Sequence, residues 1–222
     1  MKTADILTAA QKEVLNMLAA EEDLNLEYTL SGGTALAAFY LCHRRSDDLD
    51  FFSLHPVDAM RVHRFAESVR EKLSSDPLET NRLYDRHLFL IRMNAGGPLK
   101  IEFTHYPYPP LEGPIIRDGV RVESLRDIAT DKLAALLDRF EPKDYYDLFY
   151  LLHDKHASLP KMRKDLRTKF HIAADPIQLG AAFARVQRLP ILPHMLTPVR
   201  KEDVQEFFDG LADDLKSEVV TE

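Results

Sequence analysis

Cysteine is scarce in this chain, and long apolar segments are missing from it. The 222 residues include a single cysteine, Cys42, which excludes an internal disulfide and makes a reducing cytoplasm the expected location. A helix that spans a bilayer takes about 20 consecutive apolar residues; because no run in the sequence approaches that length, we expect no membrane span. The N-terminal stretch MKTADILTAAQKEV is mixed and helical in pattern, unlike a signal peptide.

Positive charge is also in short supply. The 29 Lys and Arg residues face 36 Asp and Glu residues, for a net charge of −7 at pH 7. This balance argues against a surface built uniformly for nucleic acid, and it fits a site whose carboxylates need divalent cations. One stretch is strongly basic, residues 161–169 (KMRKDLRTK). That stretch is either a contact for an RNA backbone or a solvated helix face.

The most informative stretch is residues 31–52, SGGTALAAFYLCHRRSDDLDFF. Residues 28–30 before it have the pattern of a short strand, and Gly32 with Gly33 breaks that strand so that backbone can approach a ligand closely. The next run, TALAAFYL, favours a helix. A glycine turn that leads into a helix N-terminus is a site for phosphate, because free N–H groups and the helix dipole point the same way.

Asp48 and Asp50 follow in an apolar run that predicts a second strand. Residues i and i+2 of a strand share a face, so the two carboxylates point together from backbone positions about 7 Å apart. Such a pair repels unless a positive charge lies between its members. Mg²⁺ prefers oxygen ligands of this kind and commonly bridges carboxylates to phosphates. The pattern therefore predicts phosphoryl or nucleotidyl transfer; the alternative is a surface strand with solvated acids.

Two hairpins are predicted further along. Residues 81–93 end in a β-like run, residues 94–98 form a turn, and residues 99–104 (LKIEFT) alternate as a half-buried strand does. If that strand lies beside the strand of Asp48, Glu102 supplies a third carboxylate; otherwise it is an exposed acid on a hairpin. Residues 115–122 fit a second hairpin around Asp118 and Gly119.

The remainder of the chain is predicted to be helical. Lys132 lies near the middle of the helix SLRDIATDKLAALLDRF, where it is either a solvated lysine or a functional one. The next helix, KDYYDLFYLL, places Asp144 and Asp147 on one face. Charged groups in a buried helix need partners, so Asp144 is either a structural acid or a base held towards the site.

Two blocks of this sequence resemble a known family. SGGTALAAFYLCHRRSDDLDFFS and SLRDIATDKLAALLDRFEPKDYYDLFYLL look like the motifs of the nucleotidyltransferase-fold toxins AbiEii/AbiGii, relatives of the mycobacterial MenA-type toxins. The resemblance implies an α+β fold of the polymerase-β-type nucleotidyltransferase superfamily. Its core, a mixed β-sheet flanked by helices, would occupy residues 1–122, and a helical C-terminal region would occupy residues 123–222.

The resemblance also implies roles for single residues. Asp48 and Asp50 would hold Mg²⁺, Lys132 would neutralise the triphosphate, and Asp144 would accept the proton of the acceptor hydroxyl. Glu102 is a third metal ligand only by inference from strand order. The residues expected to bind the nucleotide are Gly32, Gly33, Thr34, Arg45, Ser46 and Lys143. Many enzymes of the superfamily have Gly-Ser where this chain has Gly-Gly, so a serine hydroxyl on the phosphate is missing.

The implied activity is Mg²⁺-dependent transfer of NMP from an NTP to an acceptor hydroxyl, with the 3′ end of tRNA as a candidate acceptor. The protein would be the toxin of a toxin–antitoxin or abortive-infection system, with a cognate antitoxin as its partner. Two alternatives remain at this stage: a nucleotide- or partner-binding protein with little catalytic activity, and a nucleotidyltransferase that acts on a protein or a small molecule.

Overall fold

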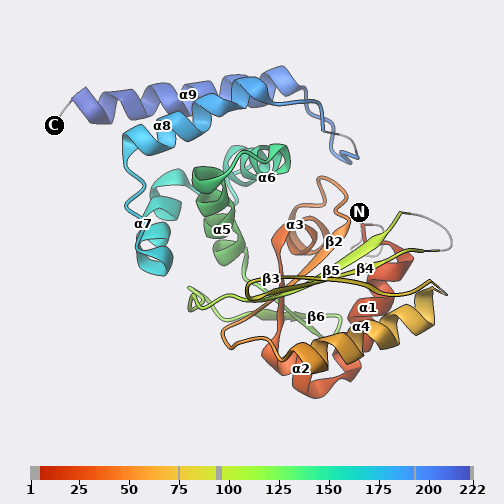
Figure 1. The fold of residues 1–222 in the computed structure, drawn as a ribbon. Coiled ribbons are helices and arrows are strands. Elements are labelled where there is room, and N and C mark those ends of the chain that lie inside the picture. The colour runs from red at the N-terminus through yellow and green to blue at the C-terminus, as the bar shows by residue number, and fades with distance from the viewer. Residues whose placement is uncertain (1–5, 75, 94–96, 193, 221–222) are drawn as a thin grey trace. The chain divides into compact units, whose positions relative to one another are not determined.

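The chain forms two compact units, Met1–Ser124 and Leu125–Glu222, called here the N-terminal and C-terminal units. The computed structural model describes residues 6–74, 76–93, 97–192 and 194–220 (Figure 1). No helix in these ranges combines the length and the apolar character needed to cross a bilayer.

The N-terminal unit is built on a seven-stranded mixed sheet with the strand order β3-β4-β5-β2-β1-β7-β6. Strand β2 pairs in parallel with β5 and antiparallel with β1, and β1 pairs in parallel with β7. The strands are β1 (Thr29–Ser31), β2 (Asp48–Ser53), β3 (Glu79–Leu83), β4 (Arg86–Ile91), β5 (Leu99–His105), β6 (Ile115–Arg117) and β7 (Val120–Val122). The prediction of an α+β fold with a mixed sheet is confirmed.

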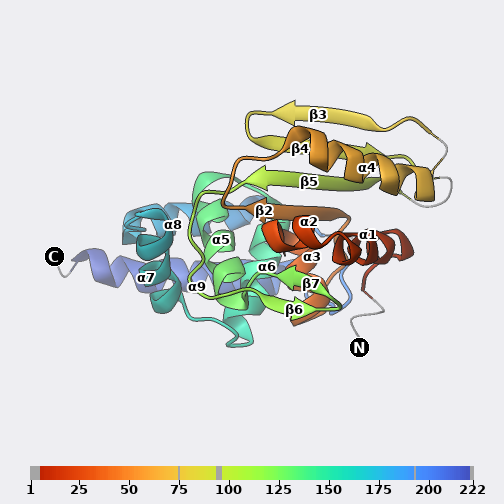
Figure 2. The same ribbon diagram turned by 90° about the horizontal axis from the view of Figure 1, so that it is seen from below.

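Helices cover one face of this sheet. Figures 1 and 2 show α1 (Ala9–Ala20), α2 (Glu22–Glu27) and α4 (Ala59–Leu73) on the same side of the strands. Side-chain caps define the starts of α1 and α4: Thr8 forms a capping box with Gln11 in α1, and Asp58 accepts two backbone N–H groups in α4. The short helix α3 (Gly32–Leu36) continues into the π-helical segment η2 (Ala37–Leu41) and connects β1 to β2.

The core lies under the helix-covered face and is centred on Phe103. Its ring stacks on Phe51 at 5.1 Å, and it meets Tyr28 edge-on at 4.9 Å and Phe65 of α4 at 6.0 Å. Along β2 the buried Leu49 and Phe51 alternate with more exposed residues. This alternation buries one face of β2 and turns its acids to the other face.

The predicted strands at residues 81–93 and 99–104 are confirmed as an antiparallel pair, β4 and β5. The predicted turn at residues 94–98 falls largely on residues 94–96, which lie outside the described residues. A second hairpin, β3 with β4, was missed. Its turn contains Tyr84 with a φ of 54°, and the sequence has no glycine there to indicate it. The hairpin of β6 and β7 around Gly119 forms as predicted.

The C-terminal unit is helical, as predicted. Its helices are α5 (Leu125–Asp138), α6 (Pro142–His153), α7 (Leu159–Phe170), α8 (Pro176–Ala184), the 3₁₀ segment η3 (Arg185–Arg188) and α9 (Lys201–Val220). The buried Tyr145 of α6 holds this unit together: its hydroxyl donates to the carbonyl of Ala182 at 2.7 Å, and its ring lies 5.3 Å from that of Phe208.

Candidate active site

Gly32 and Gly33, called here the glycine turn, follow β1 directly as the first two residues of α3, and Gly32 lies against a carboxylate. Gly32 has a φ of +69°, a conformation that side-chain-bearing residues rarely adopt. A Cβ atom at this position would lie 2.4 Å from Oδ2 of Asp50. At Gly33 a Cβ atom would lie 2.5 Å from the guanidinium of Arg44 and 3.0 Å from the hydroxyl of Ser46. A side chain at either glycine would therefore displace Asp50 or Arg44, and the turn has an acid on one side and a cation on the other.

Sheet register gathers the charged residues on the face opposite the core, called here the acidic face. Asp48 lies opposite Lys100 in the parallel pair of β2 and β5, and Asp50 lies opposite Glu102. On the other neighbour of β2, Ser31 lies opposite Asp50. Registered partners share a face. The strand adjacency on which the prediction for Glu102 depended is therefore present.

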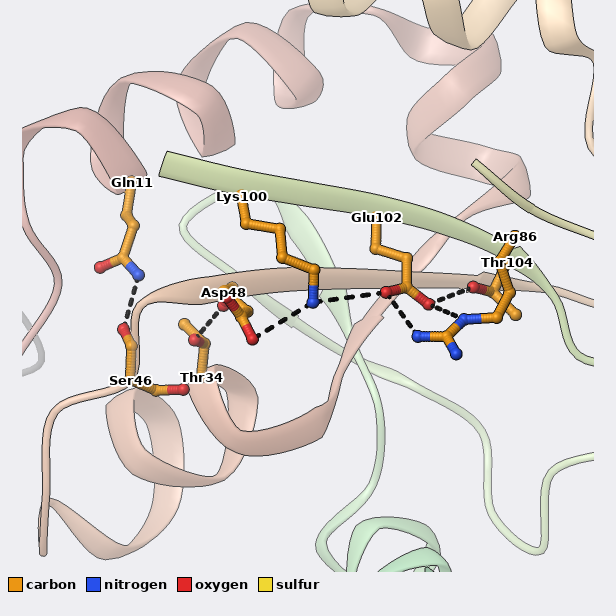
Figure 3. Close-up of polar contacts among 8 residues, drawn as sticks. All are labelled: Gln11, Thr34, Ser46, Asp48, Arg86, Lys100, Glu102 and Thr104. Carbon is orange, nitrogen blue, oxygen red and sulfur yellow. Dashed lines mark hydrogen bonds and ion pairs between the residues drawn. The ribbon is translucent and has the colours of Figure 1, made fainter. Parts of the chain in front are cut away.

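Two contacts fix the chain around the acids (Figure 3). The hydroxyl of Thr34 donates to the backbone carbonyl of Asp48, which ties α3 to β2. The side-chain amide of Gln11 donates to the carbonyl of Ser46 at 2.7 Å. Thr34 is buried, so its hydroxyl braces the strand.

Two cations, Lys100 and Arg86, contact the acids of this face. Lys100 Nζ lies 3.4 Å from Oδ2 of Asp48 and 3.6 Å from Oε2 of Glu102. Arg86 donates to both carboxylate oxygens of Glu102, at 2.6 and 2.8 Å, and the Thr104 hydroxyl donates to one of them at 2.8 Å (Figure 3). The mutual repulsion expected of paired acids is thus partly offset by the protein itself.

These contacts shift two titrations. Burial on its own would raise the pKa of Glu102, but the hydrogen bonds from Arg86 and Thr104 outweigh it and hold the pKa of this carboxyl below its ordinary value. Burial likewise opposes the charged form of Lys100, yet the nearby Asp48 and Asp50 raise the pKa of its ammonium above the ordinary value. Glu102 therefore remains an anion and Lys100 a cation across the physiological range.

The donor set at the glycine turn fits a magnesium ion. Asp50 presents carboxylate oxygens, the ligands that Mg²⁺ prefers, next to a cradle that a Cβ atom on Gly32 would fill, and Asp48 lies on the same face of the same strand. Glu102 shares the face, but its oxygens are held by Arg86 and Thr104. Within the described ranges, no three His, Cys, Asp or Glu side chains are grouped as metal ligands. Asp50 therefore lies at the turn with Asp48 on the same face, whereas Glu102 is held by Arg86 and shares Lys100 with Asp48.

The arginine that reaches the glycine turn is Arg44, which the sequence reasoning did not select. Arg44 is 3% exposed, and its guanidinium also donates to the carbonyl of Arg45 at 2.9 Å. The selected Arg45 is exposed. Ser46 lies beside Gly33 as expected. The spacing Arg-x-Ser could have indicated Arg44, because side chains two residues apart in an extended chain point the same way as each other.

The second group of predicted residues lies in the C-terminal unit. Lys132 Nζ lies 2.7 Å from Oδ1 of Asp144 and 2.7 Å from Oδ2 of Asp147. Arg139 contacts the other oxygen of Asp144 at 3.3 Å. Lys132 is 7% exposed and both aspartates are fully buried, so the interpretation of Lys132 as a solvated lysine is wrong. Lys143 is half-buried in the first turn of α6.

The basic stretch at residues 161–169 is only partly available to a ligand. Arg163 forms an ion pair with Glu218, and the buried Lys169 lies 2.9 Å from Asp127 and 2.6 Å from Asp131. The remaining cations are exposed and are called here the α7 cations: Lys161, Lys164 and Arg167.

Comparison with known proteins identifies the family. A family model described as nucleotidyl transferase AbiEii toxin, type IV toxin–antitoxin system, matches residues 14–220. The chain belongs to the AbiEii family. An uncharacterised protein of Aquifex aeolicus (strain VF5), aq_aa25, is 33% identical to this AbiEii chain over 168 residues, which are 74% of this chain and 76% of the relative.

Solved structures share the fold of this AbiEii chain. JHP933 from Helicobacter pylori is 16% identical, with a TM-score of 0.62 over 96% of this chain and 91% of that one. The nucleotidyltransferase toxin MenT4 (Rv2826c) from Mycobacterium tuberculosis H37Rv is 16% identical, with a TM-score of 0.52 over 93% of this chain and 82% of that one. The AbiEii chain is a nucleotidyltransferase with a polymerase-β-like core.

Proposed function

We propose that this AbiEii nucleotidyltransferase binds Mg²⁺ through Asp48 and Asp50 and moves a nucleoside monophosphate from an NTP to an acceptor hydroxyl. The observation that supports this most directly is the contact between Asp50 and the glycine turn, where a Cβ atom on Gly32 would lie 2.4 Å from the carboxylate. Phosphate at the turn and a cation on the acids would thus be neighbours. When bound, Mg²⁺ would offset charge on the phosphate oxygens.

The side chains around the turn have complementary tasks in this proposal. Backbone N–H groups at Gly32 and Gly33 would receive the phosphates, and the guanidinium of Arg44 next to Gly33 would offset their charge. The acceptor oxygen forms a bond to the α-phosphorus while the bond from that phosphorus to the pyrophosphate oxygen breaks. The acceptor proton is released to solvent, and pyrophosphate leaves.

The family resemblance implies that Lys132 of the C-terminal unit neutralises the triphosphate, and this role stays a prediction. Asp144 was the candidate base for the acceptor hydroxyl. Its two oxygens lie 2.7 Å from Lys132 and 3.3 Å from Arg139, and an acid paired with two cations is a poor proton acceptor. We therefore assign Asp144, together with Asp147, to positioning Lys132.

We further propose that the acceptor is RNA, with the 3′ end of tRNA as the first candidate, and that the protein acts as a toxin held in check by a cognate antitoxin. Support comes from the toxin family to which the chain belongs and from the exposed α7 cations, which could contact an RNA backbone.

The test is incubation with labelled NTPs, Mg²⁺ and total tRNA. Wild type should label RNA, and Asp48→Asn should reduce labelling about 100-fold or more, because the lost carboxylate acts on developing charge. Asp47→Asn is a matched control, since Asp47 is the exposed neighbour of Asp48, and it should label RNA as wild type does. Label in protein instead of RNA would show that the acceptor is a protein. Equal labelling by wild type and Asp48→Asn would overturn the proposal.

A further inference from the structure

A pocket of about 260 Å³ lies in the N-terminal unit, and the metal and phosphate chemistry above makes no use of it. It is smaller than the roughly 300–1,000 Å³ typical of sites for drug-sized ligands, so it suits one ring system. We call it the aromatic pocket; its lining includes Thr29, Ser31, Phe52, Tyr106, Tyr108 and Arg121.

Aromatic rings form one wall of this pocket. Phe52 and Tyr106 are stacked with centroids 4.5 Å apart, and Tyr108 meets Tyr106 at 5.0 Å. The wall is anchored, because the backbone N–H of Tyr106 donates to the carbonyl of Ser53 at 2.7 Å. Tyr108 is 40% exposed. Tyrosine rings that are held in place and open to solvent are the usual platform on which nucleic-acid bases stack.

Arg121 contributes a guanidinium to the pocket lining. Its Nε is buried, and no acceptor for that atom exists among the residues that the structure describes. The guanidinium carries further N–H donors, and a ring with oxygen or nitrogen acceptors on its edge could pair with these. On the same side of the pocket, the hydroxyl of Ser31 donates to Glu123. The lining thus combines stacking faces with an edge-reading donor.

The pocket continues the acidic face beyond Asp50. Phe52 follows Asp50 by two residues on β2, so it shares that face at a backbone distance of about 7 Å. Thr29 lies opposite Phe52 and Ser31 lies opposite Asp50. Because β1 and β2 are antiparallel, the chain beyond Ser31 runs towards Asp48. The glycine turn is therefore at the Asp48 end and the aromatic pocket at the other end, with Asp50 between them.

In phosphoryl transfer the attacking and leaving oxygens lie roughly in line on opposite sides of the phosphorus. Pyrophosphate that leaves at the glycine turn places the attacking hydroxyl on the side of the aromatic pocket. We propose that this pocket binds the terminal nucleobase of the acceptor strand, stacked on Tyr108 with its edge towards Arg121. This inference rests on the proposed function.

The probe is a ten-nucleotide single-stranded RNA with a free 3′ hydroxyl and 2-aminopurine as its last base, whose fluorescence is quenched by stacking. Four proteins are compared: wild type, Tyr108→Ala, Tyr108→Phe and Tyr84→Ala. Tyr84 is an 87% exposed tyrosine outside the pocket lining. Tyr108→Phe keeps the ring, so it separates stacking from loss of the side chain. Transfer to the same RNA is measured in parallel.

Wild type, Tyr108→Phe and Tyr84→Ala should quench the probe with similar affinity, and Tyr108→Ala should bind it about 5- to 150-fold more weakly, the range for one stacked base. In the transfer assay Tyr108→Ala should raise KM for the RNA and leave KM for the NTP unchanged. Quenching without transfer by wild type would count against the proposed function while supporting the pocket.

The proposal is overturned by wild-type transfer without quenching, by an absence of probe binding, or by equal affinity in wild type and Tyr108→Ala. A separate arm uses 2-aminopurine riboside triphosphate as the probe. If Tyr108→Ala weakens the triphosphate and leaves the RNA unaffected, the pocket holds the base of the NTP and the assignment to the acceptor is wrong.

Discussion

Replacing Gly32 with alanine perturbs the glycine turn and Asp50 together. Gly32 has a φ of +69°, and alanine in that region costs about 1–2 kcal/mol of folding free energy. The new Cβ atom would lie 2.4 Å from Oδ2 of Asp50, where ordinary contacts begin at 3.4 Å. The carboxylate must therefore move by about 1 Å, and a misplacement of that size costs about 100-fold in rate, or about 2.7 kcal/mol of barrier.

Gly119 provides a matched control. Its φ is +80°, and a Cβ atom there would lie 3.2 Å from the Cβ atom of Ala19. Gly119→Ala therefore carries a similar backbone cost, but it sits in the β6–β7 turn and leaves the acidic residues untouched. Both variants should lose about 1–2 kcal/mol of unfolding free energy, and only Gly32→Ala should lose activity.

The assay pairs urea unfolding with single-turnover transfer of labelled NMP, under conditions in which each variant is folded. The reasoning is refuted if Gly32→Ala keeps the wild-type rate. It is equally refuted if Gly119→Ala slows transfer as much as Gly32→Ala does, because the loss would then follow stability and not the position of Asp50.

Three further predictions follow from the ion pairs and the surface. Lys132→Met leaves Asp144 and Asp147 buried without their lysine, so urea unfolding should show a loss of about 3–5 kcal/mol, and Lys132→Arg should lose less. The pKa of Glu102 is lowered in the folded protein, so its ion pair stabilises the fold at pH values above the ordinary pKa of 4.5. This stabilisation is lost as the pH falls below 4.5. The difference in unfolding free energy between wild type and Glu102→Gln should therefore be constant from pH 6 to 8 and shrink in acid. Alanine at all three α7 cations should reduce the slope of log binding constant against log salt concentration for single-stranded RNA by about 2, because each phosphate contact contributes about 0.7. An unchanged slope would show that α7 does not contact the RNA.

Local sequence pattern was sufficient to place the acids of the candidate site on one face of β2 and its glycines directly after β1. The alternation around Leu49 predicts which face of β2 is buried, and the break at Gly32 predicts the turn. Each of these two sequence patterns spans only two or three residues. The pairing of Asp50 with Glu102 could be stated only conditionally, because it depends on β5 lying beside β2, and strand adjacency is set by packing of the whole sheet.

Partners that come from distant elements could not be predicted. Arg86 reaches Glu102 because β4 pairs with β5, and the β3–β4 turn at Tyr84 has no glycine to indicate where β4 begins. The ion pair of Lys132 with Asp144 joins residues 12 positions apart on two different helices, so neither helix pattern reveals it alone. The wall of the aromatic pocket could not be predicted either, since the hydrogen bond from Tyr106 to Ser53 exists only in the folded chain.

The most direct test of the central claim is a crystal structure with Mn²⁺ and a non-hydrolysable NTP analogue, with the metal located by its anomalous signal. We expect a metal peak in contact with carboxylate oxygens of both Asp48 and Asp50, and phosphates on the backbone of Gly32 and Gly33. A metal peak away from this acid pair, or phosphates bound away from the turn, would contradict the account.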